Sequence, residues 1–97
     1  MFRIPKDKQS VLKRAVDTYG AGPQLGMLME ECAELIQAAN KVIRNDGSPE
    51  SLNCLFEEAA DAFIMLGQME IMFKCTVPVN KIISSKLERL EKHLERK

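Results

Sequence analysis

The sequence lacks the features of several large functional classes. Its 97 residues contain no run of 18 consecutive apolar residues and no apolar segment near the start, so it predicts neither a membrane-spanning helix nor a signal peptide. The formal net charge is +0, from 14 basic and 14 acidic residues, which gives no overall attraction to nucleic acids or membranes. We therefore expect a soluble, cytoplasmic protein that binds neither.

Residues suited to covalent or zinc chemistry are also scarce. The three cysteines, Cys32, Cys54 and Cys75, are widely spaced and form no CxxC pair, so we expect reduced, mostly buried thiols and neither a disulfide framework nor a zinc site. The one histidine, His93, is expected on the surface. No serine or cysteine has a histidine at a suggestive spacing, and no glycine-rich loop follows a strand. The sequence thus predicts no covalent nucleophile and no phosphate-binding loop.

Prolines and turn residues divide the chain into four amphipathic segments, and no segment alternates with the period of a strand. This pattern predicts one all-α domain over residues 1–97, with four helices. The expected helices begin after Pro5 (with Asp7 as a candidate N-cap), at Pro23, at Pro49 (with Ser48 as N-cap) and at Thr76–Pro78, and the first three end near Tyr19, Asn45 and Lys74.

Two of these segments have more apolar surface than a short chain can cover. The third helix is apolar almost all the way round, so it should be buried on more than one side. The last helix has a narrow apolar seam between charged residues, as in a helix that packs along one edge. The seam consists of Val79, Ile83, Leu87, Leu90 and Leu94. Because 97 residues are few for a self-sufficient core, we expect the chain to associate with further copies of itself.

Carboxylates occupy positions where an apolar helix face should lie. At about 100° per residue, Glu31 falls inside the arc that should pack inward, Glu34 lies at its border, and Glu30 points to the polar side. In the third helix, Glu58 sits within a similar arc and Asp61 follows three residues later. The arc around Glu31 contains Met27, Leu28, Leu35, Ala38 and Val42, and that around Glu58 contains Leu55, Ala62, Met65 and Met69.

Four carboxylates that share one interior repel one another and lose hydration, at a cost of several kcal/mol each unless compensated. No lysine or arginine of the two helices falls within either arc. Divalent cations would compensate, and oxygen ligands favour Mg²⁺, with Mn²⁺ as a substitute. The alternative is that acidic runs on helices are solvated faces. That remains the expectation for Glu30, Glu57, Glu88, Glu91 and Glu95.

The residues Glu30-Glu31-x-x-Glu34, followed by Glu58-x-x-Asp61, resemble the EExxE…ExxD signature of the MazG-like all-α nucleoside triphosphate pyrophosphohydrolases. The flanking sequences GPQLGMLMEECAELIQAANKVIR and EEAADAFIMLGQMEIMF and the closing KLERLEKHL also resemble that family. The resemblance covers roughly Tyr19 to Leu94.

The resemblance implies a helical core of four or five helices, assembled as a homodimer or homotetramer. It implies that the protein cleaves (deoxy)nucleoside triphosphates to the monophosphate and pyrophosphate with Mg²⁺. It implies that the metal ligands are Glu31, Glu34, Glu58 and Asp61, and that Glu30 orients water. It also implies that Lys86 contacts phosphate, and if the last helix is rotated from this interpretation, Arg89 takes that role. Two alternatives stay open: a phosphoribosyl-nucleotide pyrophosphohydrolase, and a catalytically idle helical dimerisation or binding module.

Overall fold

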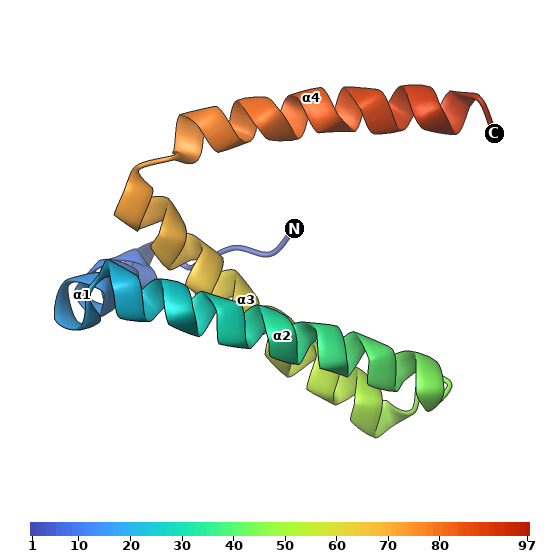
Figure 1. Cartoon of the computed structure of the whole chain (residues 1–97), viewed down its shortest axis with the longest axis horizontal. Coiled ribbons are helices and arrows are strands. Elements are labelled where there is room, and N and C mark those ends of the chain that lie inside the picture. Colours follow the sequence, from blue (N-terminus) through green and yellow to red (C-terminus); the bar gives the residue numbers. More distant parts are fainter.

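The computed structural model describes all 97 residues and contains four α-helices, one 3-10 turn and no strand (Figure 1). The expected all-α fold class is confirmed at that level. The elements are the turn η1 (Lys6–Lys8) and helices α1 (Gln9–Tyr19), α2 (Ala21–Arg44), α3 (Pro49–Phe73) and α4 (Thr76–Glu95). None of these helices combines the length and the apolarity needed to cross a membrane.

The first two helix starts differ from those expected. Asp7 lies in the 3-10 turn, and the residue at the N-cap of α1 is Lys8, whose side chain makes no capping hydrogen bond. Helix α2 begins at Ala21, so Pro23 lies within its first turn, where a missing N–H costs no intrahelical bond. Between the two helices, Gly20 has a φ of +88°, a conformation that a side chain would strain.

The boundaries of α3 agree with the expectation. The Ser48 side-chain oxygen accepts a hydrogen bond from the Ser51 backbone N–H at 3.2 Å, so Ser48 is the N-cap, and Pro49 is the first helical residue. The helix ends at Lys74, which adopts the left-handed conformation with a φ of +49° and reverses the chain before α4.

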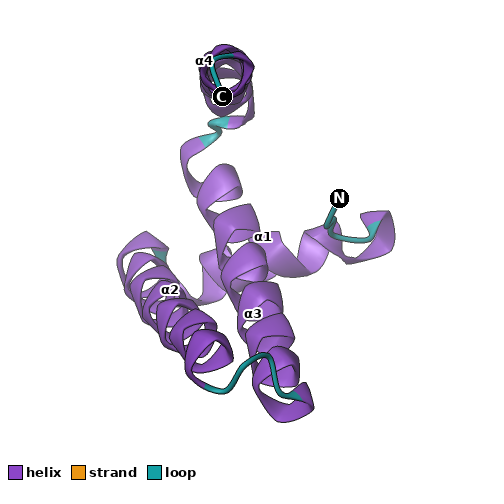
Figure 2. Cartoon of the chain, turned by 90° about the vertical axis from the view of Figure 1, so that its right-hand side faces the viewer, coloured by secondary structure: helices purple, strands orange, loops and turns teal.

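Helices α2 and α3 form an antiparallel pair, which α1 crosses at one end (Figure 2). The faces that the sequence predicted to point inward do meet: Ala38 of α2 and Ala62 and Met65 of α3 are buried, together with Leu12 of α1. A buried hydrogen bond of 2.7 Å from Gln24 Nε2 to Gln68 Oε1 joins the two helices near the α1 end. Because a register shift would break this bond and leave two polar groups buried, it helps to align the pair.

Much apolar surface stays uncovered within one chain. Helix α4 leaves the α2–α3 pair at Cys75 and forms no extensive contact with another helix (Figure 1). All five residues of its apolar seam are exposed. The outer residues Phe56 and Ile64 of α3 are exposed as well. Helix α3 thus packs against both α2 and α1, as expected for burial on more than one side, but its face with Phe56 and Ile64 stays open. The expected packing of α4 along an edge is not reached within this chain.

Candidate metal site

The predicted carboxylates of α2 and α3 converge where the two helices face each other. One carboxylate oxygen from each of Glu31, Glu34 and Glu58 lies within 4.8 Å of the other two. This happens because Glu31 and Glu34 are one turn apart on α2 and the antiparallel packing brings Glu58 of α3 opposite them. The convergence that the helical pattern predicted is thus present for these three residues.

The cluster carries polar atoms that the protein leaves without a partner. Glu31 Oε2 and Glu58 Oε2 are shielded from solvent and accept no hydrogen bond. They are the only buried side-chain nitrogen or oxygen atoms in this condition. The one ion pair of the chain, between Lys13 and Asp17, lies elsewhere on α1. An unpartnered buried carboxylate oxygen is costly, so it calls for an explanation.

Both half-buried glutamates have a raised pKa. For Glu31 the largest cause is loss of hydration on burial, followed by the negative charges of Glu34 and Asp61. Burial is also the largest cause of the raised pKa of Glu58, followed by its contact with the Glu34 carboxyl group and by the charges of Glu34, Asp61 and Glu31. The site therefore holds its negative charge unfavourably, and a bound cation would relieve the repulsion.

The other expected ligand and the water-orienting residue lie at the margin. Asp61 is exposed and outside the group of three oxygens, although its charge contributes to the raised pKa of both Glu31 and Glu58. Glu30 is exposed, and its charge is the smallest of the contributions to the pKa of Glu31. Their predicted roles stay predictions.

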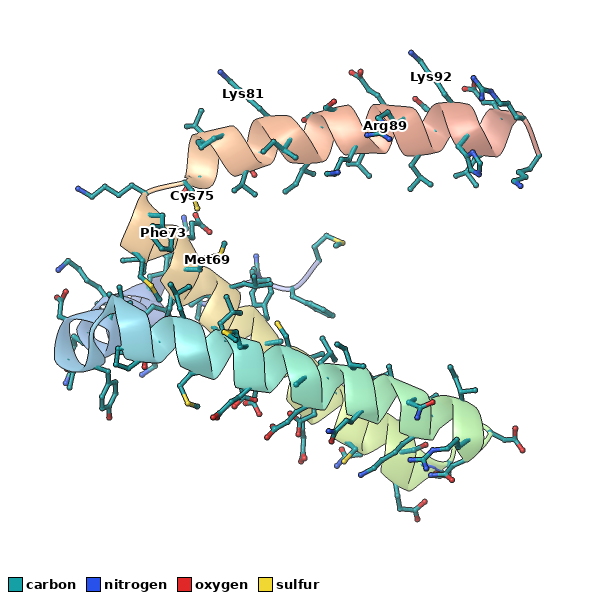
Figure 3. All side chains as sticks on the ribbon, viewed as in Figure 1. Met69, Phe73, Cys75, Lys81, Arg89 and Lys92 are labelled. Carbon is teal, nitrogen blue, oxygen red and sulfur yellow. The ribbon has the colours of Figure 1, made fainter.

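The predicted phosphate contacts do not reach the cluster within one chain. Lys86 and Arg89 are exposed on α4, which stands apart from the α2–α3 pair (Figure 3). His93, on the same helix, is exposed as expected. All three cysteines are free and of intermediate burial, so they are less buried than expected.

The sequence reasoning missed one cation beside the cluster. A hollow of about 250 Å³ is lined by Glu34, Gln37, Lys41 and Glu58, with Ala38 and Cys54 completing its wall. Lys41 lies seven residues after Glu34, so both side chains share a face of α2. That spacing is present in the sequence, but Lys41 lies outside the apolar arc of α2 that contains Glu31.

The donor set fits a hard divalent cation. Three carboxylates, two of which carry an unpartnered shielded oxygen, supply oxygen ligands and negative charge with no thiol or imidazole among them. Such a set suits Mg²⁺ or Mn²⁺ and does not suit the soft ligand preference of zinc or copper(I) sites. Comparison with protein-family models, curated proteins and solved structures found no match.

Proposed function

We propose that this chain is an Mg²⁺-dependent nucleotide pyrophosphohydrolase of the MazG-like kind, which converts a (deoxy)nucleoside triphosphate and water to the monophosphate and pyrophosphate. The observation that carries the proposal is the convergence of Glu31, Glu34 and Glu58, two of them with a shielded oxygen that no protein group contacts. The EExxE…ExxD motif, which these residues match, supports the same activity.

Each carboxylate has a role in this proposal. Glu31, Glu34 and Glu58 would hold Mg²⁺, and Asp61, the remaining motif residue, would complete the ligand set. Bound there, Mg²⁺ would supply charge neutralisation and Lewis acidity for the attack of water on a phosphorus of the α–β anhydride. Glu30 would orient that water. One P–O bond forms to the water oxygen, the bridging P–O bond breaks, and the two water protons pass to the products and solvent.

The positive side chains have separate tasks. Lys41 already lines the hollow beside Glu34 and Glu58, where its ammonium group can meet a phosphate oxygen. Lys86 and Arg89 are too remote in their own chain, so a contact with phosphate requires α4 of another copy to lie near the carboxylates. We therefore propose that Lys41 contacts the substrate bound to its own chain, and that Lys86 and Arg89 contact a substrate only in an oligomer.

Pyrophosphate release is the direct test. Purified protein is incubated with Mg²⁺ and a panel of ribo- and deoxynucleoside triphosphates plus a phosphoribosyl-ATP, and pyrophosphate and monophosphate are quantified. We expect equimolar release of both products, lost with EDTA and in Glu58→Gln. The variant Glu57→Gln is the matched control, because it removes the neighbouring exposed carboxylate and should retain activity. No release from any nucleotide would refute the proposal and favour the idle binding module.

A further inference from the structure

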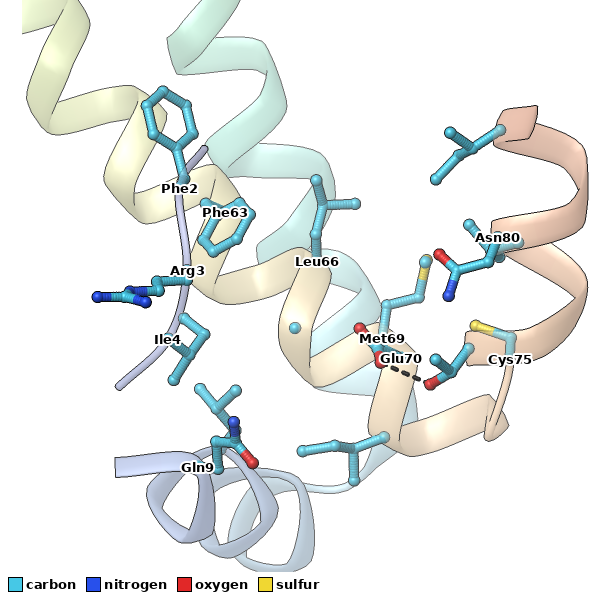
Figure 4. A pocket seen from close by; sticks show the side chains of 16 residues that line it. Phe2, Arg3, Ile4, Gln9, Phe63, Leu66, Met69, Glu70, Cys75 and Asn80 are labelled. Carbon is cyan, nitrogen blue, oxygen red and sulfur yellow. Dashed lines mark hydrogen bonds between the residues drawn. The ribbon is translucent and has the colours of Figure 1, made fainter. Parts of the chain in front are cut away.

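A second cavity, apart from the carboxylates, opens where α4 leaves α3. It measures about 530 Å³ and lies between the N-terminal segment, α1, the C-terminal half of α3 and the first turns of α4 (Figure 4). Ten of its 16 lining residues are hydrophobic, including Phe63, Leu66 and Met69 of α3. Phe2 meets Phe63 edge to face, with ring centres 5.9 Å apart, and forms one wall. We refer to this cavity as the apolar hollow.

The apolar seam of α4 begins in the hollow and continues beyond it. Val79 and Ile83 line the hollow, while the next seam residues, Leu87, Leu90 and Leu94, have exposed fractions of 58%, 50% and 59%. Three large leucines on one face of a helix, beyond the part that contacts α3, are an unsatisfied packing surface. A helix of 20 residues is itself only marginally stable in water without such packing.

The helix cannot easily close the hollow of its own chain. Only Lys74 and Cys75 separate α3 from α4, and the Thr76 hydroxyl donates a hydrogen bond to the Glu70 carboxylate across this junction (Figure 4). The Cys75 backbone N–H also bonds to the Glu70 carbonyl. These contacts fix the direction in which α4 leaves α3, so Leu87 and the residues after it lie away from the hollow.

The exposed area is what a second copy would cover. The chain exposes 7,824 Å², whereas a compact monomer of 11.0 kDa exposes about 5,600 Å². The excess of roughly 2,200 Å² is larger than the ~800 Å² that each partner contributes to a standard protein interface. The radius of gyration, 16.0 Å, likewise exceeds the ~12.5 Å expected for a compact domain of this length.

We propose that the apolar hollow receives the α4 seam of a second copy, and that the two copies exchange this contact reciprocally about a twofold axis. The α4 seam and the apolar hollow are on the same chain. One symmetric interface therefore covers both on each copy and leaves neither surface free to bind a third copy. The formal net charge of +0 means that two copies do not repel each other. The proposal does not depend on catalysis.

The assembly state is tested by light scattering after gel filtration at micromolar concentration. We expect a mass of twice 11.0 kDa, or a higher multiple if dimers associate further, and a fall to the single-chain mass in Leu90→Glu. Ser85→Glu is the matched control, because this substitution adds the same charge as Leu90→Glu on the opposite side of α4. The Ser85→Glu protein should keep the wild-type mass. A wild-type monomer would overturn the proposal.

Disulfide trapping distinguishes this arrangement from a dimer held by α4 against α4. In a background with Cys32→Ser and Cys54→Ser, Cys75 remains at the edge of the hollow, and Leu87→Cys, Leu90→Cys or Leu94→Cys is added singly. Within one chain Cys75 and position 87 are separated by about 18 Å of helix, too far for a disulfide, so any bridge between them joins two copies.

The expected result is a covalent dimer under mild oxidation that disappears when Cys75→Ser is added. Covalent dimers that form equally well without Cys75 would show that the new cysteines pair with each other. That outcome would replace the reciprocal contact with a helix pair made by α4 alone and would overturn the proposal. Because the helicity of every variant can be checked by circular dichroism, a variant that merely unfolds is recognised as such.

Discussion

Replacing Glu31 by glutamine is the sharpest test of the metal site, because it should affect the protein in opposite directions with and without the cation. Glutamine keeps the shape of the side chain and removes its charge. Glu31 Oε2 is buried and accepts no hydrogen bond, so no favourable contact of that atom is lost. The new amide N–H groups can instead donate to the neighbouring carboxylate of Glu34, which glutamate cannot do when ionised.

The magnitude follows from the geometry. Carboxylate oxygens of Glu31 and Glu34 lie within 4.8 Å of each other. Two unit charges at that distance repel by about 0.9 kcal/mol in water, and the dielectric constant of water is appropriate because Glu34 is exposed. We therefore expect Glu31→Gln to stabilise the metal-free protein by about 1 kcal/mol, which corresponds to a rise in Tm of roughly 4–8 °C for a chain of this size.

Bound Mg²⁺ should reverse the order of stability, so that the wild type becomes more stable than the Glu31→Gln variant. At a free Mg²⁺ concentration about 100 times Kd, binding stabilises the wild type by roughly 2.7 kcal/mol, while the variant has lost a ligand and gains less. Thermal unfolding followed by circular dichroism at low salt, at fixed protein concentration, with EDTA or with MgCl₂, measures both effects. Glu57→Gln is the control, and it should change neither curve. If Glu31→Gln lowers the Tm of the metal-free protein by several degrees, Glu31 has a stabilising partner and the site is misinterpreted.

Four further results are expected. Because the pKa values of Glu31 and Glu58 are raised in the folded state, the metal-free protein binds more protons folded than unfolded and should lose stability as pH rises above the ordinary value of 4.5, as urea titrations across pH can show. The affinity for Mg²⁺ should fall as pH is lowered towards 4.5, because protons compete for the carboxylates, and calorimetry measures this affinity. Lys41→Ala should lower kcat/KM by the factor that corresponds to a loss of about 1–3 kcal/mol of transition-state binding, without changing Mg²⁺ affinity in the absence of nucleotide. Lys86→Ala should do the same if α4 of another copy reaches the site; a collapse in Arg89→Ala alone would identify Arg89 as the phosphate contact.

The α2–α3 pair and its carboxylates were predictable because local signals there agree with the tertiary packing. Ser48 and Pro49 mark the start of α3, and its inward residues pack as the periodicity predicts. Placing Glu31 and Glu58 within those faces required only helical geometry. Their opposition across the two helices required an antiparallel pair, which the short turn between Arg44 and Pro49 imposes.

Other features depend on contacts that a sequence pattern does not specify. The start of α1 was misplaced because Asp7 is a good capping residue, yet a 3-10 turn precedes the helix and leaves Lys8 at the cap. The seam of α4 was correctly identified as apolar, but an apolar pattern along one helix does not specify which surface packs against it. Lys41 was overlooked because a phosphate contact can lie at the edge of an apolar arc as well as inside it.

The small core connects these observations. Seven of the 97 residues are buried, and none of the large side chains is completely buried, so packing within one chain leaves little free energy to tolerate repelling carboxylates. Glu58 of the cluster and Leu66 of the hollow belong to the same helix, α3. A cation that binds the cluster and a second copy that covers the apolar hollow both bind the native state, so each raises the free energy of unfolding. If α3 has the same structure in both bound states, the two stabilisations add. If binding of Mg²⁺ instead changes how α3 presents the hollow, the dimer dissociation constant must change with Mg²⁺, and Mg²⁺ affinity must then change with protein concentration by the same factor.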